Sequence, residues 1–457
     1  MKKLIAMLLA LVMVVGLVAC GNKAEAPEAA PEAAPEAAPE AAPEAAPEAA
    51  PEAAAEGSVY WLNFKPESDE ALQEIAAMYT EETGVSVKVV TAASGTYDET
   101  LTAQMDKSDA PTMFKVGNQA AVDTWGDYCL DLTGTDIANE LSTDAYMLYD
   151  ADGKLCSIGY CYECYGIIVK KELLVKAGYA EDYITNFATL KEVAEDVHAR
   201  AAELGFDAFS SAGMDGGSSW RFTGHLINLE YYYESVDAPE KWQSCPESLT
   251  GKYMNNFKNL YDLMVVNSAT DRAALANGGF DAAQEFADGK ALFYFNGNWE
   301  WSGLEGKGMK AEDLTMIPYY CGVEGEEKAG LNCGTENYWA VNSEASAEDQ
   351  AATIDFMTWL VTDPEASAKA VATFGVMPYK AAAASTNPFL AQANAYLADG
   401  CYNMWWATNF QPNVDAYRAT AVSALNQYNA DPTDANWETV VTAFIEGWAT
   451  QYKAANG

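Results

Sequence analysis

Hydrophobic and polar residues alternate along residues 58–457 in patterns that predict helices between short strands. The apolar run from Val59 to Phe64 predicts a strand, and apolar residues at helical spacing follow between Ser68 and Gly84. Ser68 precedes two acidic residues, as expected at a helix start, and Gly84 is expected to end this helix. A second strand is expected over 85–89, where every other residue is valine. A strand–helix–strand order of this kind predicts a parallel sheet.

The same alternation continues to the end of the chain and predicts an α/β fold. The C-terminal helix carries Trp437, Phe444 and Trp448 on one stripe, which is more typical of a core-facing surface than of a binding site. Further strands are expected at 166–169, 291–295 and 338–341, and helices at 189–204, 346–361 and 436–453.

The beginning of the chain predicts an export signal. Two lysines precede an apolar stretch over residues 4–18, which has the length of a signal peptide and is too short for a membrane-spanning helix. The stretch ends in Leu17-Val-Ala-Cys20, which resembles a bacterial lipobox, where cleavage precedes a diacylated cysteine. We therefore predict a signal peptide over 1–19 and lipidation of Cys20. The alternative is an ordinary signal peptide with a cysteine there by chance.

A repeat separates Cys20 from the folded region. The tetrapeptide Pro-Glu-Ala-Ala occurs seven times in tandem between Pro27 and Ala54. Proline at every fourth position removes a backbone donor from each turn of a helix, so the segment is expected to be extended. Residues 20–57 are therefore predicted to be a linker that holds the folded domain away from a membrane.

The charge of the chain excludes several classes of function. There are 67 Asp+Glu against 26 Lys+Arg, a formal net charge of −41. Such a surface repels phosphate backbones, so nucleic-acid binding is excluded. The only histidines are His198 and His225, so a multi-histidine site is not expected, and we predict neither a metal nor a cofactor. The sequence also contains no motif for nucleophilic catalysis or phosphate binding.

Eight cysteines follow Cys20, and outside the cytoplasm they are able to pair, in any of 105 connectivities. Cys321 and Cys333 flank a glycine-rich turn and are the strongest candidates for a local disulfide. Cys161 and Cys164 have the spacing of a redox or zinc motif. Because no second pair with this spacing exists, we expect them to be structural.

Aromatic and amide side chains gather where the predicted strands end. Ligands of open α/β sheets bind beyond the carboxyl ends of strands, and sugars need flat rings for stacking together with hydrogen-bonding groups. The recurrence of such residues therefore predicts one aromatic, hydrogen-bonding cleft. The candidate ligand-binding residues are Trp61, Asn63, Asn118, Glu163, Trp220, Arg221, Asn298, Trp299, Glu300, Tyr338 and Trp406.

Several motifs follow one another through the folded region: Tyr60-Trp-Leu-Asn63, Ala110-Pro-Thr-Met-Phe114, Cys164-Tyr-Gly-Ile-Ile-Val-Lys170, Asn296-Gly-Asn-Trp299, Tyr338-Trp-Ala-Val-Asn-Ser343 and Gly375-Val-Met-Pro378. With them, residues 58–457 resemble the extracytoplasmic solute-binding lipoproteins of carbohydrate-type ABC importers, the family 1 group that includes maltose-binding protein. The resemblance implies a two-lobed α/β fold of the type II periplasmic-binding-protein kind, in which hinge strands join lobes that close on a ligand.

The same resemblance implies an arrangement of the lobes and roles for some residues. Lobe one is expected over 58–167 and 335–376, and lobe two over 168–334 and 377–457, with hinge crossings near 165–170, 332–338 and 374–380. Trp299 matches the stacking tryptophan of the family's Asn-Gly-x-Trp motif, and Glu163 matches a sugar-binding glutamate. Lys115 departs from maltose-binding protein, which has an aromatic residue there, so a maltodextrin ligand is not implied.

The predicted function is that of a receptor, lipid-anchored at the extracytoplasmic face of a bacterial cell membrane. It would capture a sugar or oligosaccharide and deliver it to ABC permease subunits, as a monomer and without enzymatic activity. One alternative is a surface-anchored glycoside hydrolase, which needs two positioned carboxylates. The other is a receptor of the same fold for a non-sugar polar solute.

Overall fold

A computed structural model describes residues 57–456, which belong to one compact unit spanning residues 53–457. The predicted signal peptide, the lipidated Cys20 and the Pro-Glu-Ala-Ala repeat lie outside the described residues. Among the helices of residues 57–456, none is both long enough and apolar enough to cross a membrane.

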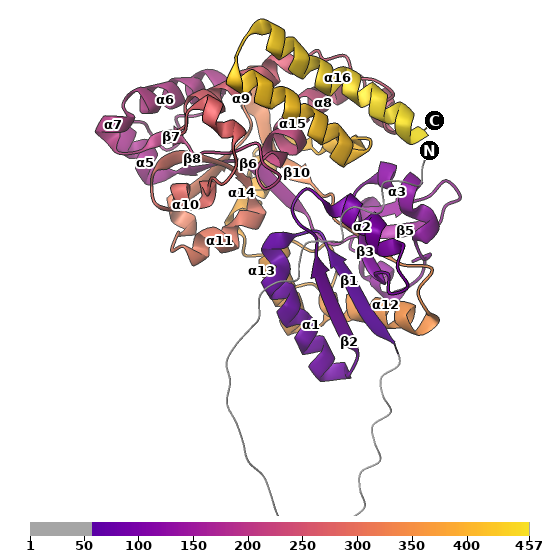
Figure 1. Cartoon of the computed structure of the whole chain (residues 1–457). Helices are drawn as coiled ribbons and strands as arrows, with labels where there is room; N and C mark the ends of the chain where they lie inside the picture. The colour runs from indigo at the N-terminus through magenta and orange to yellow at the C-terminus, as the bar shows by residue number, and fades with distance from the viewer. Residues whose placement is uncertain (1–56, 457) are drawn as a thin grey trace, which may run out of the picture. The chain divides into compact units, whose positions relative to one another are not determined.

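The first of two sheets has six strands in the order β2-β1-β3-β11-β5-β4 (Figure 1). β1 pairs in parallel with β2 and β3, as the strand–helix–strand pattern predicted, whereas β11 pairs antiparallel with β3 and β5. The strands are β1 (Ser58–Asn63), β2 (Ser86–Thr91), β3 (Met113–Val116), β4 (Met147–Tyr149), β5 (Leu155–Gly159) and β11 (Tyr338–Val341).

Helices pack on this sheet because each presents an apolar stripe to it. Gly84 ends the first helix in the left-handed conformation, as predicted, but the hydroxyl of Ser68 caps nothing and has no hydrogen-bond partner. Ser346 does cap its helix, because its hydroxyl accepts a hydrogen bond from the Asp349 backbone N–H at 3.1 Å. The helices are α1 (Asp69–Thr83), α2 (Tyr97–Met105), α3 (Gln119–Trp125), α4 (Asp136–Glu140), α12 (Ala347–Thr362) and α13 (Pro364–Phe374).

The second sheet has the order β12-β10-β6-β8-β7, with β9 pairing to β6. Its central strand, β6, is antiparallel to β8, β9 and β10, and all eight of its residues are buried. The strands are β6 (Glu163–Lys170), β7 (Asp207–Phe209), β8 (Ala291–Gly297), β9 (Leu314–Ile317), β10 (Ala329–Gly334) and β12 (Tyr402–Trp405).

Ten helices of the described residues surround the second sheet. The helix predicted over 189–204 is interrupted at Arg200 and forms two, and the C-terminal helix buries its tryptophan stripe against α15 as expected (Figure 1). These helices are α5 (Lys171–Ala177), α6 (Phe187–Ala199), α7 (Ala201–Leu204), α8 (Asn228–Asp237), α9 (Met254–Val266), α10 (Ala282–Ala287), α11 (Trp301–Gly306), α14 (Pro388–Ala398), α15 (Val414–Ala430) and α16 (Asp434–Asn456).

Three segments connect the two sheets. The chain passes from β5 to β6 at residues 160–162, returns from β10 to β11 at 335–337, and passes again between α13 and α14. In the third segment Val376 pairs with Tyr162 of the first. Because β6 already pairs with the second sheet from Glu163 onward, residues 163–167 do not belong with the first sheet, where we had expected them. The remaining lobe boundaries stay predictions.

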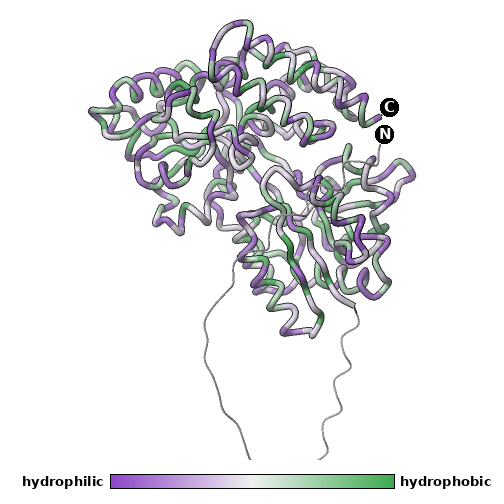
Figure 2. The backbone as a smooth tube through the Cα atoms, viewed as in Figure 1, coloured by the Kyte–Doolittle hydropathy of each residue, from purple (hydrophilic) through white to green (hydrophobic). Residues whose placement is uncertain are grey.

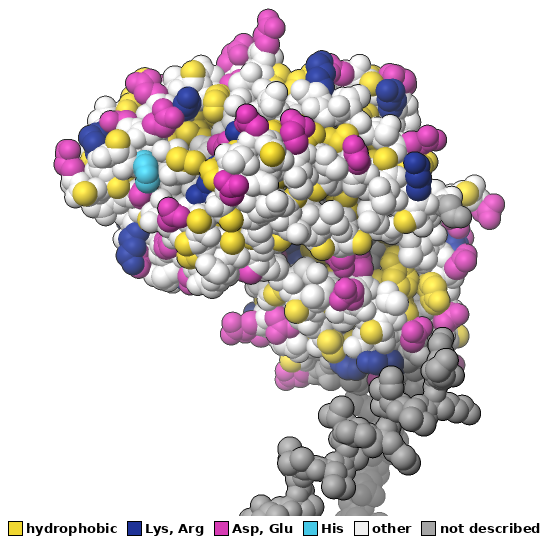
Figure 3. Space-filling view, turned by 45° about the horizontal axis from the view of Figure 1, so that its top comes forward, with side chains coloured by type: hydrophobic (Ala, Val, Ile, Leu, Met, Phe, Trp, Pro, Cys, Tyr) yellow, Lys and Arg dark blue, Asp and Glu magenta, His cyan; other side chains and the backbone are white. Residues whose placement is uncertain are grey.

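The apolar residues of the strands form the buried clusters between sheets and helices (Figure 2). Acidic side chains spread over the surface seen in Figure 3, in keeping with the net charge. In this structure all eight cysteines of residues 57–456 are in the reduced form. The predicted Cys321–Cys333 disulfide is wrong, because these two side chains lie in different hydrophobic clusters.

Candidate ligand-binding site

A cavity of about 600 Å³ is lined by residues from both sheets and from the segments that connect them. On the first sheet, β1 and β3 end at its wall, with Lys65 following β1 and Asn118 following β3. On the second sheet, β8 and β12 end there, and Trp299 and Trp406 follow them. The cavity thus lies beyond the carboxyl ends of strands, where ligands of α/β sheets bind. Its volume is within the range of small-molecule sites.

One wall of the cavity is aromatic and is centred on Trp299. The centroid of its ring lies 6.1 Å from that of Trp220 and 5.3 Å from that of His225, and Tyr165 stacks on His225 at 4.1 Å. Burial lowers the pKa of His225 to about 3, so its ring is neutral. We call Trp220, His225, Trp299 and Trp406 the aromatic wall, and Tyr165 supports it from behind His225.

Two glycines make room for tryptophans of this wall. A Cβ atom on Gly297 would lie 2.2 Å from the ring of Trp299, so the ring rests directly on the glycine backbone. A Cβ atom on Gly334 would likewise lie 2.8 Å from Trp406. The Asn-Gly-x-Trp motif therefore has a steric cause: only glycine two residues before Trp299 leaves space for its ring.

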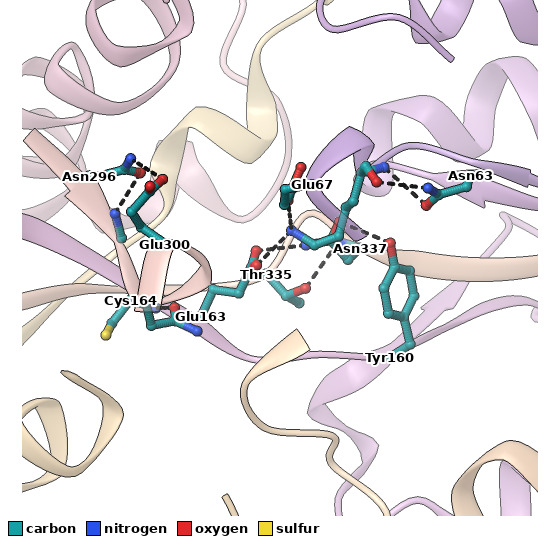
Figure 4. Close-up of polar contacts among 12 residues, drawn as sticks. Asn63, Glu67, Tyr160, Glu163, Cys164, Asn296, Glu300, Thr335 and Asn337 are labelled. Atoms are coloured by element: carbon teal, nitrogen blue, oxygen red, sulfur yellow. Dashed lines mark hydrogen bonds and ion pairs between the residues drawn. The ribbon is translucent and has the colours of Figure 1, made fainter. Parts of the chain in front are cut away.

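A buried ion pair lies beside the aromatic wall. Lys65 Nζ is 2.7 Å from Glu163 Oε1 and 3.2 Å from Glu67 Oε1, and Asn337 Nδ2 donates to Glu163 Oε2 at 2.8 Å (Figure 4). Burial lowers the pKa of Lys65, but Glu163, Glu67 and other nearby groups together raise it more, so the net shift is upward and Lys65 is charged. Both oxygens of Glu163 are thus engaged with protein groups. A buried charge needs such partners to be tolerated.

Asn63 positions Lys65. Its Nδ2 donates to the Lys65 carbonyl at 2.7 Å, and its Oδ1 accepts from the Lys65 backbone N–H at 3.0 Å, so the chain turns sharply after β1. This turn brings the Lys65 ammonium group 5.8 Å from the centroid of the Trp299 ring. Asn63 is fully buried and does not line the cavity.

Among the charged groups that line the cavity, Lys115, Glu336 and Arg418 carry polar atoms that have no protein partner within residues 57–456. Lys115 Nζ lies 3.4 Å from the centroid of the Phe64 ring and makes no hydrogen bond or ion pair. Arg418 Nε donates to Gln411 Oε1 at 2.8 Å, and the guanidinium group lies against Gly224. Its terminal nitrogens make no hydrogen bond with residues 57–456. The Glu336 carboxylate accepts no hydrogen bond. We call Lys115, Glu336 and Arg418 the unpaired polar group.

The charges of the unpaired polar group influence one another. Burial raises the pKa of Glu336, but Lys115, Arg418 and other nearby groups together outweigh burial, so the net shift is downward and the carboxylate is ionised. Burial lowers the pKa of Lys115, and Glu336 opposes this shift. Charges of both signs therefore face the cavity in positions where a ligand can reach them.

Arg221 and Glu300 also line the cavity but are engaged with the protein. Arg221 Nε donates to the Phe295 carbonyl at 3.0 Å, and its guanidinium group lies 4.3 Å from the centroid of the Trp220 ring. Glu300 accepts a hydrogen bond from Asn296 Nδ2 at 2.8 Å (Figure 4), and burial raises its pKa. Within residues 57–456, no cluster of three or more His, Cys, Asp or Glu side chains is placed to hold a metal ion.

The sequence of residues 74–399 matches the family model described as bacterial extracellular solute-binding protein. The chain belongs to this family. None of the curated proteins matches the sequence.

Solved structures with the same two-lobed fold are solute-binding proteins of distant sequence. One is RafE, a protein of Streptococcus pneumoniae, in complex with raffinose. It is 16% identical to this chain, the match covers 85% of this chain and 98% of the RafE chain, and the TM-score is 0.65. A sugar transporter protein of Bacillus licheniformis in complex with stachyose is 14% identical over 86% and 100%, with a TM-score of 0.63. The GacH receptor of Streptomyces glaucescens is 17% identical over 88% and 98%, with a TM-score of 0.60.

For this member of the family, the structure brings seven of the eleven predicted site residues to the cavity. Asn118 lines the cavity, and its Oδ1 also caps α3 by accepting from the Ala121 N–H at 2.8 Å. The seven residues that line the cavity are Asn118, Glu163, Trp220, Arg221, Trp299, Glu300 and Trp406.

The other four predicted site residues do not line it, and each has a structural role instead. Trp61 is 2% exposed and packs edge-on against Trp339 in the core, because alternate residues of β1 face opposite sides of the sheet. Asn63 forms the turn described above. Asn298 is buried and accepts from the Cys164 backbone N–H at 2.7 Å, and Tyr338 is buried in β11.

Sequence reasoning missed several charged residues that line the cavity. Lys65 and Lys115 stand at the ends of β1 and β3, where the strand-end rule that selected Asn63 and Asn118 should also have selected them. Lysine is scarce in this acidic chain, which is a further signal. Glu336 and Arg418 lie on a connecting segment and inside a helix, and no local pattern indicates them.

Proposed function

We propose that this protein is the sugar receptor of an ABC importer and that it binds a neutral sugar or oligosaccharide in the cavity without converting it. The sugar ligands named for the solved relatives support this proposal, as does the chemistry of the cavity. Membership in the extracellular solute-binding family agrees with a site of action outside the cytoplasm.

The observation that carries the proposal is the meeting of the aromatic wall and the unpaired polar group in one cavity. A sugar presents apolar ring faces, which stack on tryptophan, and hydroxyl groups, which both donate and accept hydrogen bonds. Lys115 and Arg418 are donors and Glu336 is an acceptor, so together they satisfy neighbouring hydroxyls. Because the cavity carries both signs of charge, a neutral polyhydroxylated ligand fits it better than an ion does.

A hydrolase would need a free acid and a free base on either side of a glycosidic bond. Glu163 is engaged through both oxygens by Lys65 and Asn337, and Glu300 accepts from Asn296. These partners favour a binding or positioning role for Glu163 and Glu300 over a role as a catalytic pair. We therefore propose that the protein is not an enzyme.

Titration calorimetry tests the proposal with a panel of neutral monosaccharides and oligosaccharides, uronic acids and short peptides, followed by chromatography of each ligand. We expect saturable heat with at least one neutral sugar and its recovery unchanged. Shorter products after incubation would show a hydrolase. Heat from peptides or uronic acids but from no neutral sugar would show a receptor for another class of solute.

We further propose that Cys20 anchors the protein by its acyl chains and that it acts as a monomer beside its permease. Two or more acyl chains give durable membrane attachment. A Cys20→Ala variant is then expected in the culture medium, whereas the wild-type chain stays in the membrane fraction. Release of both proteins to the same extent would contradict the anchor.

A further inference from the structure

Two cysteines face each other across neighbouring strands of the second sheet. In the antiparallel pair of β6 and β10, Cys164 is directly opposite Cys333. Directly opposite residues in such a pair have Cα atoms about 4.5–5.5 Å apart. This separation falls within the roughly 4.4–6.8 Å that a disulfide bond spans.

Both side chains point to the same side of the sheet. Cys164 and Cys333 belong to one buried cluster, with Ile168 and Leu331 at alternate positions of the same strands, while Tyr165 packs in a different cluster. Phe389 of α14 packs in the same cluster. The thiols therefore share one face under a helix and are out of reach of bulk solvent. Figure 4 shows the Cys164 side chain beside Glu163 at the start of β6.

The position of this pair in the fold gives it a mechanical role. Cys164 follows the first connecting segment by two residues, and Cys333 precedes the second by two residues. A bond between them would join these two segments where they enter the second sheet. The ends of both segments would then stay at a fixed distance from each other when the sheets move relative to one another. Neither cysteine lines the cavity.

We propose that Cys164 and Cys333 form a structural disulfide in the exported protein. The step needs an oxidant, which is a small-molecule disulfide or a thiol–disulfide oxidoreductase outside the cytoplasm. One thiolate attacks the oxidant's disulfide and displaces one thiol, and the second thiolate then attacks the mixed disulfide and displaces the other. The two thiol protons and two electrons of the cysteines end on the two thiols of the reduced oxidant. Since both sulfurs are buried in the folded protein, the bond forms while the strands pair during folding.

The two thiols also contact each other in the folded protein. A hydrogen bond with Cys164 holds the pKa of the Cys333 thiol below its usual value, and the Tyr162 hydroxyl acts in the same direction. Burial raises the pKa of Cys164.

Peptide mapping of the protein refolded with oxidised glutathione tests the proposal directly. We expect an intact mass lower by two hydrogen atoms per bond and, without reduction, a peptide pair that links Cys164 to Cys333. Cys245 and Cys401 are partly exposed and have no cysteine partner on a neighbouring strand, so alkylation should label them. Alkylation of both Cys164 and Cys333 in the denatured, oxidised sample would overturn the proposal, as would a bond from either to another cysteine such as Cys129 or Cys156.

A stability measurement separates this bond from other effects of oxidation. Because the bond closes a long loop, reduction of the wild type should lower the melting temperature by roughly 5–10 °C. The Cys164→Ser/Cys333→Ser variant should show no such difference between oxidised and reduced samples, whereas the Cys245→Ser control should keep the wild-type difference. An equal difference in the double variant would contradict the proposal.

Discussion

The substitution Gly297→Ala tests the aromatic wall without removing any aromatic side chain. The added Cβ atom would stand 2.2 Å from the Trp299 ring, whereas ordinary contact begins at 3.4 Å, so the ring must move by more than an ångström. It cannot do so without disturbing Trp220 and His225, which pack beside it. Gly297 has an extended backbone with φ −124°, so alanine adds no backbone strain of its own.

The expected magnitude follows from the stacking contact that is lost. Aromatic stacking contributes about 0.5–1.5 kcal/mol beyond the area it buries, and about 1.4 kcal/mol is a tenfold change in Kd. We therefore expect Gly297→Ala and Trp299→Ala each to weaken sugar binding by roughly tenfold or more in calorimetry. The double variant should lose little more than either single one, because both changes remove the same contact.

Gly306→Ala is the matched control, since a Cβ atom at this α11 glycine meets no atom within 4 Å. Its affinity should equal that of the wild type. The steric reasoning fails if Gly297→Ala binds as tightly as Gly306→Ala, or if the losses from Gly297→Ala and Trp299→Ala add in full.

Three further predictions concern the charged groups. Lys115→Met removes an unpaired donor from the cavity and should weaken sugar binding by about tenfold, a typical loss for one charged hydrogen bond. The control Lys88→Met changes an exposed site outside the cavity and should leave the calorimetric affinity unchanged. If Lys115→Met binds sugar as tightly as Lys88→Met, the role of Lys115 is refuted. Lys65→Met leaves Glu163 buried without its cation and should lower the free energy of unfolding by about 3–5 kcal/mol in urea titration. Adding Glu163→Gln to this variant should restore part of the lost stability. A Lys65→Met variant as stable as the wild type would contradict the role of the ion pair. Burial raises the pKa of Asp415 from 3.8 to about 6, so the folded state binds its proton more tightly than the unfolded state does. This contribution to stability is present below pH 3.8 and is lost as the pH rises through 6. The melting temperature of Asp415→Asn should therefore rise relative to that of the wild type between pH 4 and pH 7, and a constant difference between the two proteins over this range would rule this out.

The sequence alone determined most of the secondary structure and the class of the fold. Apolar periodicity located β1, α1 and the C-terminal helix within a few residues, because these elements are long enough for one face to show. The family resemblance agreed with the family that the chain proved to belong to. Trp299 was also accessible to sequence reasoning, since the glycine that makes room for it is only two residues away.

Tertiary structure alone decided which side chains meet the cavity. Alternation along β1 shows that Trp61 and Leu62 face opposite sides, but it does not show what covers each side, and helices distant in sequence bury Trp61. The unpaired polar group is likewise assembled from β3, a connecting segment and α15, which no short motif spans. The pairing of Cys164 with Cys333 depends on the register of two strands far apart in the chain. In each case the deciding contact is long-range, and local sequence patterns carry information only about neighbours along the chain.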